Sequence, residues 1–220
     1  MTGPDLQAEK RAVARAAADL VEDGMRVGLG TGTTVAELLP ALGGRGLSLT
    51  CVATSPATER LARATGLRVE PFGGIERLDL AIDGADQVGP AGWLVKGGGG
   101  AHTRERIVAA AADRFVVIVS SDKPVDHLRP PAPLELLRFG LAATVRSLPG
   151  VVLRDAPGTP DGGVLADYHG DVEDPGRLAR FLDAAPGVVS HGLFPPSLVS
   201  LVLVARGDRV EERPLPRLSI

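Results

Sequence analysis

The chain has 220 residues and a formal net charge of −3 at pH 7, which allows one large domain or a domain with a smaller companion. Apolar residues make up 44% of the chain and aromatic residues only 3%, so Leu, Val, Ile and Ala must form the core. The acidic balance provides no basic field for nucleic acid, and no run approaches the roughly 20 apolar residues of a membrane-spanning helix. The polar N-terminal residues lack the apolar stretch of a signal peptide, which favours a cytoplasmic protein. The single cysteine, Cys51, excludes an intramolecular disulfide, and its apolar neighbours predict a buried structural thiol.

The first half of the chain predicts strands that alternate with helices. Helices are expected at four segments: residues 6–22, 34–42, 55–66 and about 103–112. The Ser55-Pro56 pair is a particularly good start signal, because serine caps a helix and proline suits its first position. Strands are expected at five segments: residues 26–29, 47–54, 67–72, 78–82 and 115–120. Such alternation is typical of a parallel sheet covered by helices on both faces.

After the proline-rich stretch at residues 129–133 the order of elements changes. Strands and helices are expected in the order βαββαβ, at residues 134–139, 141–148, 151–154, 164–168, 175–185 and 188–191. This order is the split, ferredoxin-like α+β arrangement. A hairpin at residues 198–212 is expected to return to the first domain. The sequence therefore predicts a parallel-sheet domain of residues 1–130 and 198–220, and a smaller α+β domain of residues 131–197.

A glycine-rich turn, Gly28 to Thr34, separates an expected strand from an expected helix. Its backbone N–H groups, its threonine hydroxyls and the N-terminus of the helix together can bind an anion. The spacing fails the dinucleotide fingerprint because residue 33 is Thr, and no lysine is placed as in a P-loop. A tight structural turn without a ligand is the alternative.

The segment from Lys96 to Gly100 is the most informative part of the chain. Four consecutive glycines leave backbone N–H groups able to press against a ligand. Lys96 stands before them, and Glu105 follows near the start of a helix, where a favourable interaction with the helix dipole is an alternative reason for a glutamate. The combination suits a small anionic substrate that undergoes proton transfer.

Two aspartates and a second lysine follow strands of the expected sheet. Asp83 and Asp86 come after residues 78–82, and Lys123 comes after residues 115–120. The carboxyl ends of parallel strands form the ligand crevice, so all three side chains can reach it. Turn-forming aspartates, a metal site and an exposed lysine are the alternatives, but the four histidines and Cys51 form no ligand-spaced pair.

Four blocks of the sequence, taken in order, resemble ribose-5-phosphate isomerases of the A type. Residues 30–34 resemble the GTGST loop of the family, residues 83–87 its DGADE block, residues 96–99 with 103–105 its KGGG and TRE blocks, and residues 121–125 its SK-x-V segment. The resemblance covers nearly the whole chain. It implies a Rossmann-like α/β domain with a ferredoxin-like α+β domain. It also implies a homodimer without metal or cofactor that interconverts ribose 5-phosphate and ribulose 5-phosphate, through an enediolate, in the non-oxidative pentose phosphate pathway.

The resemblance also implies roles for individual residues. The general base falls on Glu105, and the other active-site residues fall on Asp83, Asp86 and Lys96. Substrate-binding positions are implied at Thr31, Gly32, Thr33, Thr34, Gly84, Ala85, Gly97, Gly98, Gly99 and Lys123. These residue types suit the chemistry, because one carboxylate can move a proton between neighbouring carbons, and such acid–base catalysis contributes about 10²–10⁴-fold. A lysine and backbone N–H groups can stabilise the oxyanion that develops.

Three alternatives stay open. Departures from the family pattern at Gln87, at His102 and around Asp122 leave room for a paralogue that acts on another sugar phosphate. The fold is also similar to non-catalytic effector domains of regulators that respond to sugar phosphates, although residues 1–25 are too short for a DNA-binding helix-turn-helix. An acyl-coenzyme A transferase with a glutamate nucleophile is the third, and the phosphate-type loop together with residues 83–86 argues against it.

Overall fold

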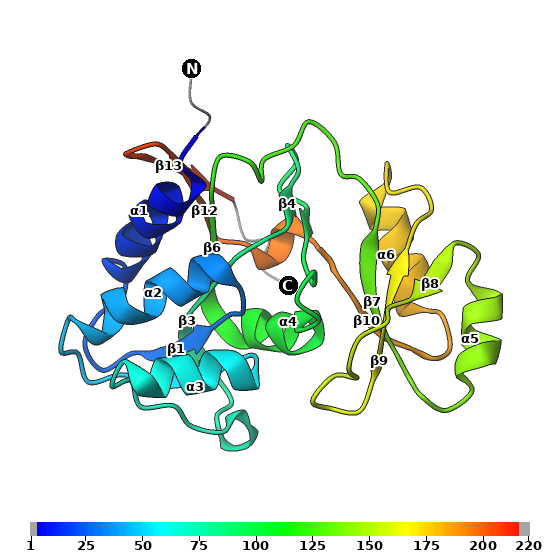
Figure 1. Ribbon diagram of the computed structural model, residues 1–220, viewed down its shortest axis with the longest axis horizontal. Coiled ribbons are helices and arrows are strands. Elements are labelled where there is room, and N and C mark those ends of the chain that lie inside the picture. Colours follow the sequence, from blue (N-terminus) through cyan, green and yellow to red (C-terminus); the bar gives the residue numbers. More distant parts are fainter. Residues whose placement is uncertain (1–3, 216–220) are drawn as a thin grey trace. The chain divides into compact units, whose positions relative to one another are not determined.

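The computed structural model describes residues 4–215, which divide into two compact units (Figure 1). The first unit consists of residues 4–85, 104–123 and 196–215, and the second of residues 86–103 and 124–195. These bounds differ from the expected domains chiefly at residues 86–103 and 124–130, which group with the second unit. The reason is that residues 86–103 contain two short strands that pair with each other and with residues 193–194.

The first unit is built on a six-stranded sheet. In sheet order its strands are β13 (Arg209–Pro214), β12 (Leu201–Arg206), β6 (Ala112–Val119), β3 (Leu78–Asp83), β1 (Arg26–Leu29) and β2 (Thr50–Ala53). All neighbours from β2 to β12 are parallel, and β13 is antiparallel to β12. Without β13 this is a doubly wound sheet of order 2-1-3-4-5, in which the chain changes direction between β1 and β3. Ligands bind such sheets at the carboxyl ends of the strands at that switch point.

Helices cover both faces of this sheet, as the sequence predicts (Figure 1). They are α1 (Leu6–Ala18), α2 (Thr33–Gly43), α3 (Pro56–Ala64) and α4 (His102–Ala111). Alternate residues of β1 point to opposite faces: Val27 and Leu29 join the core with α1 and α2, whereas Gly28 faces α4. A Cβ atom on Gly28 would lie 2.4 Å from Cγ1 of Val108, so glycine allows α4 to approach the sheet closely. None of the helices in residues 4–215 combines the length and apolarity needed to cross a membrane.

A buried glutamate ties α1 to two turns of the first unit. Glu9 is 1% exposed, and its carboxylate accepts hydrogen bonds of 2.8 Å from the N–H groups of Ser121 and Gly207. Burial alone would raise the pKa of this carboxyl. The hydrogen bonds from the two backbone N–H groups outweigh that effect, so the pKa lies below its ordinary value. The stabilisation is therefore present above the pKa of the unfolded chain and is lost as the pH falls through the lower pKa of the folded protein. Glu9 thus fixes the turn that follows β6.

The second unit has the expected ferredoxin-like arrangement. Its main sheet is antiparallel and has the order β10 (Val188–His191), β7 (Ala132–Leu136), β9 (Val164–Tyr168) and β8 (Val151–Leu153). Helices α5 (Leu141–Ser147) and α6 (Pro175–Asp183) share one core with this sheet. The strands are thus ordered 4-1-3-2, as the βαββαβ pattern predicts.

A small antiparallel sheet of the second unit is not expected from the sequence. It consists of β11 (Leu193–Phe194), β5 (Leu94–Val95) and β4 (Gln87–Val88). Each strand has two residues, which is too short to show an alternating pattern. The sheet frames the glycine-rich segment, because Lys96 directly follows β5.

The prediction of a strand at residues 67–72 is wrong. This segment forms a single bridge between Val69 and Cys51 and then a short 3-10 turn, Phe72–Gly74. Backbone hydrogen bonds join Cys51 to the residues on either side of Val69, but Pro71 has no N–H group with which to continue the ladder. Cys51 itself is fully buried, as expected, and burial raises the pKa of its thiol to about 11.

Candidate active site

Asp83 ends strand β3 at the switch point of the first unit and lies against the loop after β1. Its Oδ1 atom accepts hydrogen bonds from the N–H groups of Thr31, at 3.1 Å, and Gly84, at 2.7 Å. The residue is 3% exposed. A Cβ atom on Gly30 would lie 1.9 Å from Cγ of Asp83, so only glycine at position 30 admits the carboxylate.

The threonines of the glycine-rich loop have different surroundings. The Thr31 hydroxyl lies 2.8 Å from that of Thr54 and 3.2 Å from that of Thr58. Thr58 in turn donates to the carbonyl of Gly30. The side chain of Thr31 therefore helps to hold the loop together. Thr54 and Thr58 lie outside every motif and were not identified from the sequence.

Helix α2 begins at the end of this loop with an N-terminus suited to an anion. Its N-cap, Gly32, has a φ of 136° and provides no side-chain hydrogen bond to the first turn. The N–H groups of that turn, together with the exposed Thr33 and the partly exposed Thr34, are left to bind a ligand. This is the geometry that the phosphate-type loop predicts.

Glu105 lies in the first turn of α4 and is 5% exposed. Three residues later on the same helix face, Val108 packs beside Gly28 of β1. Ala111 of α4 leads directly into β6, so the helix runs back along the sheet and its N-terminal turn lies toward the carboxyl ends of the strands. Glu105 and Asp83 therefore belong to the same edge of the sheet.

Lys123 lies in the turn after β6, at the same edge. Its Nζ atom is 3.1 Å from Oδ2 of Asp122, whose Oδ1 accepts a hydrogen bond of 2.5 Å from Ser120. Burial raises the pKa of Asp122, but the hydrogen bonds from Ser120 and Lys123 outweigh it and hold the pKa below the ordinary value. The Lys123 side chain keeps 34% of its surface exposed, so it can still receive an anionic ligand.

A second group of expected site residues lies in the second unit. The N–H group of Gly98 donates a hydrogen bond of 2.8 Å to Oδ2 of Asp86. Gly97 has a φ of +105°, and a Cβ atom there would lie 2.7 Å from Nδ1 of His102, so glycine is required. Lys96 is 3% exposed, and its Nζ atom lies 5.5 Å from the centre of the Phe194 ring.

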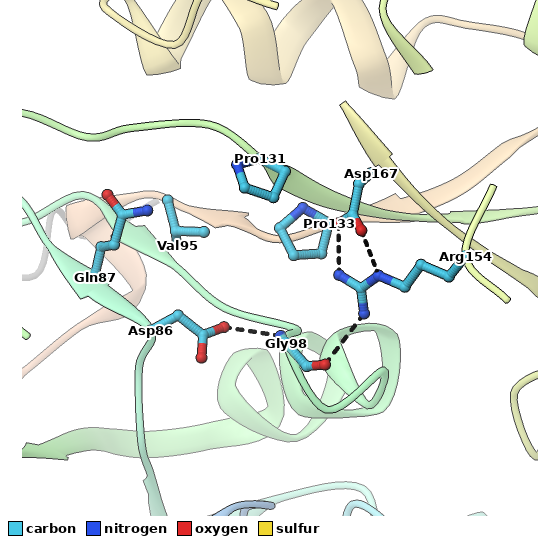
Figure 2. A pocket seen from close by; sticks show the side chains of 8 residues that line it. All are labelled: Asp86, Gln87, Val95, Gly98, Pro131, Pro133, Arg154 and Asp167. Atoms are coloured by element: carbon cyan, nitrogen blue, oxygen red, sulfur yellow. Dashed lines mark hydrogen bonds and ion pairs between the residues drawn. The ribbon is translucent and has the colours of Figure 1, made fainter. Parts of the chain in front are cut away.

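A cavity of about 360 Å³ in the second unit adjoins this group (Figure 2). Its lining includes Asp86 and Gly98 together with two residues that no motif singles out, Arg154 and Asp167. In Figure 2, Asp86 and Arg154 lie on opposite sides of Gly98 and both are hydrogen-bonded to it.

The structure thus brings the expected residues into two groups. Those of the first unit are Thr31, Gly32, Thr33, Thr34, Asp83, Gly84, Ala85, Glu105 and Lys123, and those of the second are Asp86, Lys96, Gly97, Gly98 and Gly99. Within the described part of the chain, no three His, Cys, Asp or Glu side chains gather closely enough to hold a metal ion.

Comparison with known proteins identifies the family of the chain. The model of the family described as ribose 5-phosphate isomerase A (phosphoriboisomerase A) matches residues 50–209. The curated ribose-5-phosphate isomerase A of Gluconobacter oxydans (strain 621H) is 44% identical over 228 residues, covering 96% of this chain and 98% of the relative. The chain belongs to the ribose 5-phosphate isomerase A family. It is therefore an isomerase that interconverts ribose 5-phosphate and ribulose 5-phosphate.

Solved structures of the family have the same fold. Ribose 5-phosphate isomerase A from Methanocaldococcus jannaschii has a TM-score of 0.88 and 33% identity, covering 94% of this chain and 98% of that one. A D-ribose-5-phosphate isomerase in complex with phospho-erythronic acid has a TM-score of 0.89 and 29% identity, covering 96% of this chain and 99% of that one. A second family model, the DeoR C-terminal sensor domain, matches residues 6–91, which end before the ferredoxin-like sheet begins.

Proposed function

We propose that Glu105 is the base that moves a proton between C2 and C1 of open-chain ribose 5-phosphate. It removes the C2 proton, which leaves an enediolate, and returns the proton to C1 while C2 becomes the ketone. The observation that carries the proposal is a buried glutamate in the first turn of α4, at the sheet edge that also holds the phosphate-type loop.

Asp83 and Asp86 are proposed to exchange the hydroxyl protons of the sugar and to assist in opening its ring. They are three residues apart, so the extended chain limits their Cα atoms to a separation of about 11 Å. Asp83 is supported by its two backbone hydrogen bonds, and Asp86 by its bond to the glycine loop. Both carboxylates are therefore held in defined orientations.

Lys96 and the N–H groups of Gly97 and Gly99 are proposed to stabilise the enediolate oxygens, while the N–H of Gly98 orients Asp86. A buried cation and fixed backbone dipoles act strongly on a developing negative charge because little solvent reorganisation is needed. The 3% exposure of Lys96 and the positive φ of Gly97 support this role. We also propose that phospho-erythronic acid binds here, because its carboxylate has two neighbouring oxygens like those of the enediolate.

The phosphate is proposed to bind at the N-terminus of α2, through Gly32, Thr33 and Thr34 with the Thr31 backbone, and to Lys123. Gly84 and Ala85 complete the substrate-binding set after β3. Support comes from the uncapped first turn of α2 and from the partly exposed Lys123 side chain after β6. Both lie at the carboxyl edge of the first unit's sheet.

Replacing Lys123 with Ala is expected to raise KM by about 10-fold or more with a smaller change in kcat, because phosphate contacts are similar in ground and transition states. Steady-state kinetics with ribose 5-phosphate checks this result. Lys123→Arg keeps the charge and serves as the control, with a KM expected between those of wild type and Lys123→Ala. A lower kcat at unchanged KM would instead assign Lys123 to the reacting end of the sugar.

No divalent metal is expected to be required. Lys96 provides a fixed positive charge beside the glycine loop that binds Asp86, so the enediolate needs no metal in this mechanism. Exhaustive dialysis against a chelator followed by assay in metal-free buffer is expected to leave kcat unchanged. A large loss that a single divalent cation restores would contradict this mechanism and make Asp83 and Asp86 candidate ligands.

Incubation of the purified protein with ribose 5-phosphate and detection of ketopentose tests the activity itself. A set of other aldose phosphates tests the specialised paralogue, which would convert one of them faster. Binding of sugar phosphate without turnover would instead match the non-catalytic effector domain, an alternative that the family membership of the chain argues against. A homodimer in the cytoplasm is proposed from the family resemblance, and light scattering after size exclusion tests the dimer.

A further inference from the structure

Arg154 follows strand β8 and forms a two-pronged ion pair with Asp167 of β9. Its Nε atom lies 2.8 Å from Oδ2 of Asp167, and its Nη2 atom lies 2.6 Å from Oδ1. The two side chains are only 17% and 19% exposed. Two parallel hydrogen bonds fix the plane of a guanidinium group as well as its position. Arg154 is therefore a rigid donor.

The remaining nitrogen of this guanidinium binds the glycine loop. Nη1 donates to the carbonyl oxygen of Gly97 at 2.9 Å. It also donates to that of Gly98 at 3.2 Å, a bond drawn in Figure 2. Two successive carbonyl groups thus point toward one cation. The Gly97 carbonyl also accepts a hydrogen bond of 3.0 Å from the N–H of Gly100 within the loop. Glycines turn their peptide groups with little steric cost, so Arg154 matters most for the carbonyl of Gly98.

The trans peptide transfers this orientation to the N–H groups. In a planar trans peptide, the C=O and N–H bonds point in opposite directions. The peptide between Gly97 and Gly98 is held on one side by Arg154 and on the other by Asp86, which accepts the Gly98 N–H at 2.8 Å. The next peptide has its carbonyl on Arg154, so the N–H of Gly99 is directed away from the arginine. Arg154 thereby directs two successive donors toward the side of the loop opposite its own.

We propose that Arg154, fixed by Asp167, is a positioning residue for the isomerisation. It holds the peptide between Gly98 and Gly99 so that the N–H of Gly99 can stabilise the enediolate, while the N–H of Gly98 holds Asp86. This inference rests on the proposed role of the glycine loop. Without the guanidinium group, the peptide between Gly98 and Gly99 can turn its carbonyl oxygen toward the developing negative charge, which raises the energy of the transition state more than that of bound substrate.

The test compares Arg154→Ala, Arg154→Lys and Asp167→Asn with wild type. Arg154→Ala is expected to lower kcat by about 10-fold or more with KM within about threefold of wild type. Arg154→Lys is expected to recover part of the loss, because an ammonium group can bind one carbonyl. Asp167→Asn keeps Arg154 but removes the carboxylate charge that pairs with it, and is expected to lower kcat by a smaller factor. Arg146→Ala removes an exposed arginine of α5 in the same unit and is the matched control, with kinetics like wild type.

Two further measurements separate positioning from general structural damage. Inhibition by phospho-erythronic acid is expected to weaken in Arg154→Ala by a factor similar to the loss in kcat, whereas inhibition by inorganic phosphate is expected to stay unchanged. Millimolar guanidinium is expected to restore part of the kcat of Arg154→Ala and to leave wild type unaffected. Equal losses of affinity for both inhibitors, or a folded Arg154→Ala variant with kcat within twofold of wild type, would overturn the inference.

If Arg154→Ala fails to fold, the Asp167→Asn and Arg154→Lys variants test the inference instead. The measurement is again the change in inhibition by phospho-erythronic acid relative to the change in inhibition by inorganic phosphate. The outcome is also separable from that of the proposed function. A wild-type protein that does not convert ribose 5-phosphate would contradict the function, whereas an active wild type with fully active Arg154 variants would contradict only the positioning role.

Discussion

Replacing Glu105 with Gln is expected to lower kcat by about 100-fold or more while the fold is retained. Glutamine has nearly the same shape as glutamate, so the first turn of α4 and the packing of Val108 on the sheet should persist. The amide cannot accept a proton at neutral pH, so the transfer between C2 and C1 loses its carrier. Steady-state kinetics and the thermal unfolding midpoint together measure the two parts of this expectation.

Glu76→Gln is the matched control, because Glu76 is an exposed glutamate of the same unit. It is expected to behave like wild type in both measurements. A Glu105→Gln variant that retains more than a tenth of wild-type kcat would remove Glu105 from its role as the base. Equal thermal stability of the two variants would show that any loss of turnover is chemical.

The second large effect is expected from Gly30→Ala, which should remove nearly all turnover and lower the free energy of unfolding by about 1–3 kcal/mol. The added methyl group would lie 1.9 Å from both Cγ and Oδ1 of Asp83. The carboxylate would have to leave the N–H groups of Thr31 and Gly84, which hold it from two sides. Both the loop after β1 and the aspartate at the end of β3 would then be displaced. Turnover and urea unfolding of the variant check the two effects.

Gly74→Ala provides the control for this substitution. A methyl group added at Gly74 would meet no atom of the described residues within 4 Å, and the φ of Gly74 is not positive, so the variant should be as active and stable as wild type. Should Gly30→Ala keep wild-type activity, the carboxylate of Asp83 could move without consequence. Asp83 would then have no precise role in the reaction.

Regular elements of this fold are predictable from the sequence where they are long enough to show a period. The strands at residues 26–29, 164–168 and 188–191 have the expected bounds, and the βαββαβ order correctly predicts the second sheet. The two-residue strands β4, β5 and β11 are not predictable, because pairing between distant segments creates them. The prediction of a strand at residues 67–72 is wrong for a different reason. The residues alternate as in a strand, but Pro71 has no N–H group and ends the pairing.

The candidate site divides in the same way. Motif residues such as Asp83, Lys96 and Glu105 are recognisable because they stand beside glycines and at the ends of strands. Arg154 and Asp167 are not, because an arginine after one strand and an aspartate in the next form no local signature. Only folding brings Arg154 to the carbonyl groups of a glycine loop more than fifty positions earlier in the chain. Support for a backbone segment therefore needs coordinates, whereas the segment itself can be read from its glycines.

The position of β12 has a consequence for biosynthesis. This strand lies between β6 and β13 in the first unit's sheet, but the ribosome makes it only after the entire second unit. Until then β6 is an open edge of a parallel sheet, with unpaired N–H and C=O groups available to other chains. The Gly207 partner of Glu9 is also still missing at that stage. Chains that stop before Leu201 therefore lack the strand that pairs with this edge of β6, which makes them prone to aggregation.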